Sequence, residues 1–161
     1  MKTTTKSKIA KLTVFLIGIF LIVSCEKNTI YKKYEKIPRG VWEKTYRTSF
    51  DFEIKDTTQL VQIDVLVRNA SLYPYRNLWL FVHQTTPDGT VRSDTLECIL
   101  ADANGKWLGD GMGDIWDNEI PWRLNYKFTQ TGTYQYEIEH GMRNDIVPGI
   151  MDIGLNIKLQ E

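Results

Sequence analysis

The sequence predicts an all-β protein: an antiparallel β-sandwich, jelly-roll-like, of about eight strands. Three observations support this prediction. Apolar and polar residues alternate with a period of two in run after run, turn residues separate these runs, and no stretch after residue 30 keeps a helical period. Strict alternation marks a strand with one buried and one solvated face. Many short strands at this spacing are typical of a sandwich.

The predicted strands follow one another at residues 50–54, 61–67, 78–82, 96–100, 122–128, 134–138 and 151–159. The last run alternates most clearly, with apolar residues at every second position from 151 to 159. The run 78–82 is apolar throughout, which predicts a central strand covered on both sides. Leu96, Cys98 and Leu100 share one face of their strand, so we expect Cys98 in the core as a small hydrophobic residue.

Turn signals separate the predicted strands. Thr86-Pro87-Asp88-Gly89-Thr90 predicts a hairpin, because proline presets one turn dihedral and Asp-Gly accepts positive φ. Tyr73-Pro74 interrupts the chain before the 78–82 strand, and residues 103–106 and 130–133 carry further turn residues. Short connections of this kind favour antiparallel neighbours.

The start of the chain differs from the rest. Residues 1–11 hold four lysines and no acidic residue, and an almost unbroken apolar run follows from Leu12 to Val23. This pattern is typical of a bacterial secretory signal, and the run is shorter than the roughly 20 residues that cross a bilayer. It ends in Ile22-Val23-Ser24-Cys25, which resembles a lipobox. We therefore expect cleavage before Cys25 and a diacylglyceryl and acyl modification of this cysteine, which anchors the protein stably.

These features divide the chain into a lipoprotein signal peptide at 1–24, a lipidated cysteine and tether at 25–45, and a single β-sandwich domain at 46–161. The predicted tether is rich in basic residues: Lys27, Lys32, Lys33, Lys36 and Arg39. Basic charge beside a lipid anchor is attracted to anionic headgroups, and a solvated linker without lipid preference is the equal alternative. We expect the protein in the cell envelope, with the outer membrane favoured over the inner.

Charge and cysteine content narrow the function further. The signal segment holds four of the 20 basic residues and none of the 20 acidic ones, which leaves 16 basic and 20 acidic residues and a net charge of −4. Because the mature chain has more acidic than basic residues, we do not expect a basic nucleic-acid-binding surface. With Cys25 taken by lipid, Cys98 has no internal disulfide partner, so the core alone must hold the fold.

The span ADANGKWLGDGMGDIWDNEIPW, residues 101–122, is the first candidate for a binding site. Its candidate binding residues are Trp107, Asp110, Asp114 and Trp116. Exposed tryptophan faces at Trp107 and Trp116 would suit a sugar platform, whereas a long irregular loop held by buried tryptophans is the favoured interpretation. The glycines of 109–113 do not have the spacing of a dinucleotide fingerprint.

Acidic residues in the same span raise the question of a metal. Asp102 begins a pattern like a calcium loop, but the ligand positions that an EF-hand needs are not met, because Lys106, Trp107 and Gly113 occupy three of its fixed places. An irregular calcium site remains an alternative, built from Asp110, Asp114, Asp117 and Glu119. We expect no metal and no cofactor beyond the lipid on Cys25.

The sequence offers no catalytic residue. Glu137 and Glu139 share one strand face, as glycosidase carboxylates can, but a solvated sheet face predicts the same spacing more often. His83 and His140 stand alone, outside any ligand-like spacing, and we expect His83 to be packed in the core or an interface. Neither Cys98 nor any serine lies in a nucleophile motif, so the sequence predicts a protein that is not an enzyme.

Four segments together resemble the gliding motility lipoprotein family GldH of Bacteroidetes. They are YPYRNLWLFV (73–82), DTLECILADANGKWLGDGMGDI (94–115), TGTYQYEIEHGMR (131–143) and GIMDIGLNI (149–157). The resemblance implies a cell-envelope lipoprotein needed for gliding, in species whose motility machinery is tied to a secretion system. It implies no catalytic residues, so only the lipid site at Cys25 is carried over.

The sequence thus predicts a non-enzymatic accessory lipoprotein of the motility and secretion machinery. Its expected partners are the membrane, through the anchor, and other envelope or motility proteins, with no nucleic acid and no small-molecule ligand. The alternative is a carbohydrate-binding module of the cell-surface glycan-binding kind, which would use exposed tryptophans.

Overall fold

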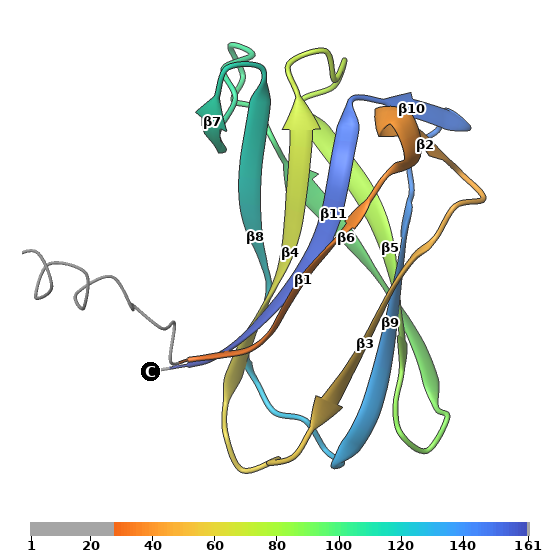
Figure 1. Cartoon of the computed structure of the whole chain (residues 1–161), viewed down its shortest axis with the longest axis vertical. Coiled ribbons are helices and arrows are strands. Elements are labelled where there is room, and N and C mark those ends of the chain that lie inside the picture. The colour runs from red at the N-terminus through yellow and green to blue at the C-terminus, as the bar shows by residue number, and fades with distance from the viewer. Residues whose placement is uncertain (1–27, 161) are drawn as a thin grey trace, which may run out of the picture.

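In the computed structural model, residues 28–160 are described, and they form two layers of antiparallel strands (Figure 1). A five-stranded sheet has the order β1-β11-β4-β8-β7, a four-stranded sheet the order β3-β9-β5-β6, and a two-stranded ribbon pairs β2 with β10. The strands are β1 (Thr29–Lys36), β2 (Val41–Glu43), β3 (Thr48–Ile54), β4 (Val61–Ala70), β5 (Asn77–Thr85), β6 (Val91–Ile99), β7 (Asp110–Met112), β8 (Ile115–Tyr126), β9 (Gly132–His140), β10 (Ile146–Pro148) and β11 (Ile150–Leu159), with a 3-10 turn at η1 (Pro38–Gly40).

The eight long strands have the topology of a jelly roll. They divide into two groups of four, β1-β11-β4-β8 and β3-β9-β5-β6, and consecutive strands along the chain repeatedly change sheet. Every strand pair within residues 28–160 is antiparallel. This arrangement is two interlocked Greek keys. The predicted all-β antiparallel sandwich is therefore confirmed, with three short strands added to the eight long ones.

The predicted tether is wrong over most of its length. Residues 29–36 form β1, which pairs with β11 from Thr29↔Lys158 to Lys36↔Asp152, and residues 41–43 form β2, which pairs with β10. The domain therefore begins at β1 rather than at residue 46. β1 is an edge strand, where lysines at solvent-facing positions discourage pairing with other chains. The predicted signal peptide and Cys25 lie outside the described residues.

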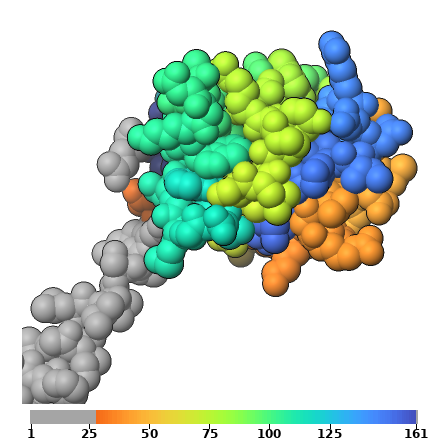
Figure 2. Space-filling view, turned by 90° about the horizontal axis from the view of Figure 1, so that it is seen from above, coloured from red at the N-terminus to blue at the C-terminus, as the bar shows by residue number. Residues whose placement is uncertain are grey.

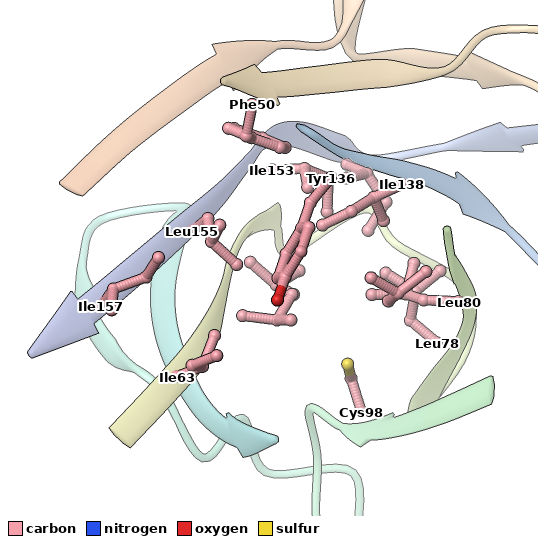
Figure 3. Close-up of a cluster of buried hydrophobic side chains, with 14 of the residues drawn as sticks. Phe50, Ile63, Leu78, Leu80, Cys98, Tyr136, Ile138, Ile153, Leu155 and Ile157 are labelled. Atoms are coloured by element: carbon pink, nitrogen blue, oxygen red, sulfur yellow. The ribbon is translucent and has the colours of Figure 1, made fainter. Parts of the chain in front are cut away.

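The core fills the space between the sheets (Figure 3). Inward-facing residues of both sheets meet there, among them Phe50, Ile63, Leu80, Tyr136 and Leu155, each 0–1% exposed. Cys98 lies among them at 0% exposure, which confirms its predicted place in the core. Burial raises the pKa of its thiol to about 12, so the thiolate that would react is suppressed at neutral pH.

The sequence predicts that both faces of the central strand β5 are covered, but only one face is. Leu78, Leu80 and Val82 point into the core and are fully buried, whereas Trp79 and Phe81 point outward and are 39% and 38% exposed. β5 is central because β6 and β9 pair with it on its two sides. It is covered on one face only, and its outer face carries aromatic rings.

His140, at the end of β9, is buried in the end of the sandwich beside Trp42, with ring centroids 5.6 Å apart. Burial lowers the pKa of His140, and nearby Lys44 lowers it further. The side chain is therefore held neutral as part of the core.

No helix of residues 28–160 is long and apolar enough to span a membrane.

Candidate functional site

The span 101–122 is more ordered than an irregular loop. The carboxylate of Asp102 accepts the backbone N–H groups of Asn104 and Lys106 at 2.8 and 2.9 Å, which closes a tight turn. Residues 110–112 then form β7, which turns back at Gly113 and pairs with β8. From residue 115 onward the span belongs to β8. What remains at the end of the sandwich is a turn followed by the β7–β8 hairpin.

The two candidate tryptophans hold this end of the molecule together. Trp107 is half-buried against the core, and its ring centroid lies 6.4 Å from that of Tyr73. Trp116 is half-buried, and its Nε1–H donates to Ser71 Oγ at 3.0 Å. A Cβ atom at Gly111 would collide with the Trp116 ring, so the ring packs directly on the β7 backbone. Both rings are engaged in packing.

The four acidic residues of the calcium alternative do not converge. Asp110 and Asp114 are exposed, whereas Asp117 pairs with Arg68 at 2.6 Å and Glu119 pairs with Lys158 at 2.6 Å. Within residues 28–160, no group of three His, Cys, Asp or Glu side chains is placed to hold a metal ion. The irregular calcium site gains no support from this geometry.

The outer face of the five-stranded sheet is closed by its own polar side chains. Asp64 on β4 is fully buried there, and Lys158 Nζ lies 2.9 Å from its Oδ2 and 2.6 Å from Glu119 Oε1. Gln62 Nε2 donates to Asp64 Oδ1 at 2.6 Å. Farther along the sheet, the Arg68 guanidinium lies over the Tyr34 ring, 5.0 Å from its centroid. These side chains cover the buried Asp64 and make the outer face of the sheet polar.

Burial raises the pKa of Asp64, and the adjacent Glu119 carboxyl raises it as well. Burial alone would also raise the pKa of Glu119, but hydrogen bonds from Lys158 and Asp64 outweigh it and lower the value. The two carboxyl groups and the ammonium group therefore act as one cluster, in which the buried carboxyl holds its proton more tightly.

The outer face of the four-stranded sheet is open and carries a groove of about 560 Å³. We call it the aromatic groove and define it by Tyr75, Asn77, Trp79, Phe81, Met142 and Asn144. Its walls come from β5 and from the segment that joins β9 to β10. This segment lies beside residues of the 70s at the end of the sandwich (Figure 2). A volume of this size is in the range of ligand-binding sites.

A hydrogen-bonded row crosses the same sheet next to the groove. His83 Nδ1 lies 2.8 Å from Ser93 Oγ, His83 Nε2 lies 3.0 Å from Glu139 Oε1, and Arg47 Nε lies 2.6 Å from Glu139 Oε2. Burial would raise the pKa of Glu139, but hydrogen bonds from Arg47 and His83 lower it. His83 thus lies on the outer face in a polar row, rather than in the core. Glu137 and Glu139 do share this outer face, as their spacing predicts.

The amino-acid sequence alone does not reveal the aromatic groove. A uniformly apolar run such as 78–82 carries no period that separates an inner from an outer face. A signal was nevertheless present, because Trp79 and Phe81 are large aromatic residues at alternate positions among aliphatic ones. The row of His83, Ser93 and Glu139 depends on strand register, which a single sequence does not display.

The fold defines the class of this protein as a single-domain jelly-roll β-sandwich. The chain belongs to the GldH lipoprotein family, whose model matches residues 29–157. It is 34% identical over 152 residues to the "Gliding motility lipoprotein GldH homolog" of Christiangramia forsetii, covering 90% of this chain and 93% of that protein. It is 28% identical over 155 residues to the "Gliding motility lipoprotein GldH" of Flavobacterium johnsoniae, covering 92% of this chain and 96% of that protein.

Among solved structures, the chain is similar to one of infectious bursal disease virus, Gt strain, with a TM-score of 0.36 and 17% sequence identity. The likeness covers 83% of this chain and 32% of the viral chain. A similarity this distant carries no functional argument.

Proposed function

We propose that this protein is a lipid-anchored, non-enzymatic component of the gliding motility machinery and its associated secretion system. In this proposal it works in the cell envelope, with the outer membrane favoured, and acts through contacts with other envelope proteins. The observation that carries the proposal is the 34% identity to a gliding motility lipoprotein GldH homolog across 90% of the chain. The lipobox ending in Cys25 agrees with it.

A non-enzymatic role is supported by the chemistry of the row formed by His83, Ser93 and Glu139. An acyl-transfer site needs hydrogen-bond donors, such as backbone N–H groups, directed at the developing oxyanion. The row lies on a flat sheet face, where the N–H groups of β5 and β6 lie in the plane of the sheet rather than above Ser93. Arg47 also holds the second oxygen of Glu139. The row is better suited to holding three strands together.

The partner surface in this proposal is the end patch, which we define as the β7–β8 hairpin and the residues beside it: Leu72, Leu108, Asp110, Met112 and Asp114. Its apolar members are strongly exposed, with Met112 at 91%, Leu72 at 66% and Leu108 at 57%. Ser71 N–H donates to the Asp114 carbonyl at 2.8 Å, which places Leu72 next to the hairpin. Exposed apolar side chains that lie together are typical of protein interaction sites.

Site-specific photocrosslinking tests this surface. A photoreactive amino acid at position 112, in cells that glide, is expected to form a discrete adduct with an envelope protein, because Met112 on the hairpin is 91% exposed. The matched control is position 91, since Val91 is also strongly exposed at 63%. The adducts are resolved by immunoblotting and identified by mass spectrometry. Equal labelling from both positions, or labelling from position 91 alone, would contradict the end patch as the partner surface.

The lipid anchor has its own test. A Cys25→Ala variant is expected to lose the acylated N-terminal peptide in mass spectrometry and to leave the membrane fraction, because no other acyl chain would hold the mature protein. Gliding is expected to be lost with it. Wild-type protein in the same strain is the control. A Cys25→Ala protein that has lost residues 1–24, as judged by its mass, and that still stays in the membrane fraction would show that Cys25 is not the anchor.

The carbohydrate-binding alternative through Trp107 and Trp116 loses its main support. Such a platform needs exposed rings, and both tryptophans are half-buried in packing contacts. The residues 101–114 therefore suit a protein contact better than a sugar platform.

A further inference from the structure

The outer face of the four-stranded sheet carries two large aromatic side chains that are exposed to solvent. Trp79 and Phe81 lie two positions apart on β5, so their side chains project from the same face about 7 Å apart along the strand. Large exposed aromatic residues that lie together mark binding surfaces more often than chance exposure does. Residues paired with them on β6 are polar, namely Glu97 beside Trp79 and Thr95 beside Phe81.

The Phe81 ring and the backbone of Trp79 are held in place before any ligand arrives. A Cβ atom at Gly141 would lie 3.1 Å from the Phe81 ring, so this ring rests on the chain that leaves β9. The Trp79 N–H donates to Met142 Sδ at 3.4 Å, and the Trp79 carbonyl accepts the Gly141 N–H at 2.6 Å. A rigid aromatic floor loses little conformational freedom on binding.

The rim of the groove consists of oriented amide and hydroxyl groups. Asn77 Nδ2 donates to Glu97 Oε1 at 2.6 Å, and Asn144 Nδ2 donates to the Tyr75 hydroxyl at 2.9 Å. Each amide keeps a carbonyl oxygen and a second N–H, and the tyrosine hydroxyl keeps a further site. A flat apolar floor with donors and acceptors along its edge matches a sugar ring, which has an apolar C–H face and hydroxyl groups around its rim.

Charge at the groove favours a neutral ligand. Arg143 lies along the groove, and Glu97 adjoins Asn77, so one positive and one negative group stand near the ligand space. A strongly acidic polymer would require an excess of basic groups, because a balanced pair of charges produces no net field that attracts anions.

The backbone argues against an added peptide strand. In the groove the Trp79 N–H and carbonyl already have partners, and the Asn77 carbonyl accepts the Tyr73 hydroxyl at 2.8 Å. Peptides that extend a sheet depend on such main-chain groups for their affinity. The groove therefore recognises its ligand through side chains.

We propose that the aromatic groove binds a neutral glycan chain, with Trp79 and Phe81 as the stacking platform and Asn77 and Asn144 as hydrogen-bonding groups. The proposal goes beyond the function proposed above and does not depend on it. The groove lies at the end of the sandwich that holds β2 and β10, whereas β1 begins at the opposite end, four residues after Cys25 in the sequence (Figure 1). A glycan site in the groove would thus lie at the other end of the sandwich from the start of β1.

The test uses the full lipoprotein in detergent and a panel of soluble polysaccharides. Neutral glucan, xylan, mannan and galactan are compared with acidic alginate by affinity electrophoresis, and binding is quantified by tryptophan fluorescence. At least one neutral polysaccharide is expected to retard the wild-type protein. Trp79→Ala is expected to weaken that binding by about tenfold or more, and Asn144→Ala by a smaller factor. Leu124→Ala is the matched control, because Leu124 is 58% exposed on β8, and it is expected to bind as the wild type does.

The melting temperatures of all variants are measured alongside. Should Trp79→Ala fail to fold, Asn144→Ala decides the question, since Asn144 is an exposed rim residue. The proposal is overturned by the absence of binding to every neutral polysaccharide, by binding to alginate alone, or by folded Trp79→Ala and Asn144→Ala proteins that bind as tightly as the wild type. Loss of binding in Leu124→Ala, with the groove variants unaffected, would overturn it as well.

Discussion

A chain that begins at residue 46 is expected not to fold, whereas a chain that begins at Asn28 is expected to fold as the full protein does. The shorter chain lacks β1, so β11 loses the neighbour with which it pairs from Thr29 to Lys36. It also lacks Trp42 and Ile37, which are 0% and 3% exposed in the core. Removal of a core tryptophan costs about 3–5 kcal/mol and removal of a core isoleucine about 2–5 kcal/mol. Together these losses come to about 5–10 kcal/mol, which is comparable to the whole stability of a domain, about 5–15 kcal/mol.

Circular dichroism and one-dimensional proton NMR on the two purified chains check this expectation. The chain from residue 28 should show a cooperative thermal transition and dispersed amide signals, and the chain from residue 46 should show neither. The single variant Trp42→Ala in the longer chain is an intermediate case, expected to lose about 3–5 kcal/mol and to show a cooperative transition at a lower temperature. A cooperative transition in the chain from residue 46 would mean that β1 and β2 are not integral to the fold.

The reason that β1 escaped sequence-based prediction lies in its composition. Strands such as β3 and β11 have one face in the core, and their alternation is visible in the sequence. β1 lies at the edge of the sheet, where the pair Lys32-Lys33 breaks the alternation and a register shift falls between Thr29 and Tyr31. Solvated edge strands carry the charges that also mark a linker. The sequence pattern of residues 29–36 is thus compatible with an edge strand and with a linker.

The candidate sites were less accessible to sequence reasoning than the fold was. The composition of the span 101–122 is that of a binding loop, because glycine, tryptophan and aspartate are frequent in such loops, yet the same residues build turns and close packing here. Gly111 permits the Trp116 ring to lie on β7, and Asp102 closes a turn. The aromatic groove depends on which segments lie beside β5, and this follows from long-range strand order rather than from any local pattern.

Among substitutions on the outer faces of the sheets, we expect the largest loss of stability in the cluster formed by Lys158, Asp64 and Glu119. In Lys158→Met, the aliphatic stem of the side chain is kept and the ammonium group is lost, so Asp64, at 0% exposure, faces Glu119 without a cation. Breaking a buried ion pair by removing one partner costs about 3–5 kcal/mol. Because Lys158 and Glu119 have side-chain exposures of 33% and 41%, we expect a loss near the lower end, about 3 kcal/mol.

A control variant and a double variant test whether the loss in Lys158→Met comes from the contact between Lys158 and Asp64. Lys33→Met removes a lysine that pairs with Glu35 on the same sheet but is half exposed, and it is expected to leave the unfolding free energy close to that of the wild type. The double variant Asp64→Asn/Lys158→Met removes the charge that the cation balances, so it should recover most of the stability lost in Lys158→Met. Additive losses in the double variant would show that the two groups are not coupled.

The sign of the pH effect follows from Asp64. Its folded pKa is raised above the ordinary value of 3.8, and loss of the ammonium group is expected to raise it further. A carboxyl group with a raised folded pKa stabilises the protein below its unfolded pKa, and this stability is lost as the pH rises through the folded value. The deficit of Lys158→Met should therefore be small near pH 4 and largest above neutral pH, as measured by urea unfolding across that range. Protonation of Asp64 at low pH removes the charge that Lys158 otherwise balances. A stability deficit that grows as the pH falls would therefore show that the effect does not come from the buried Asp64 carboxylate.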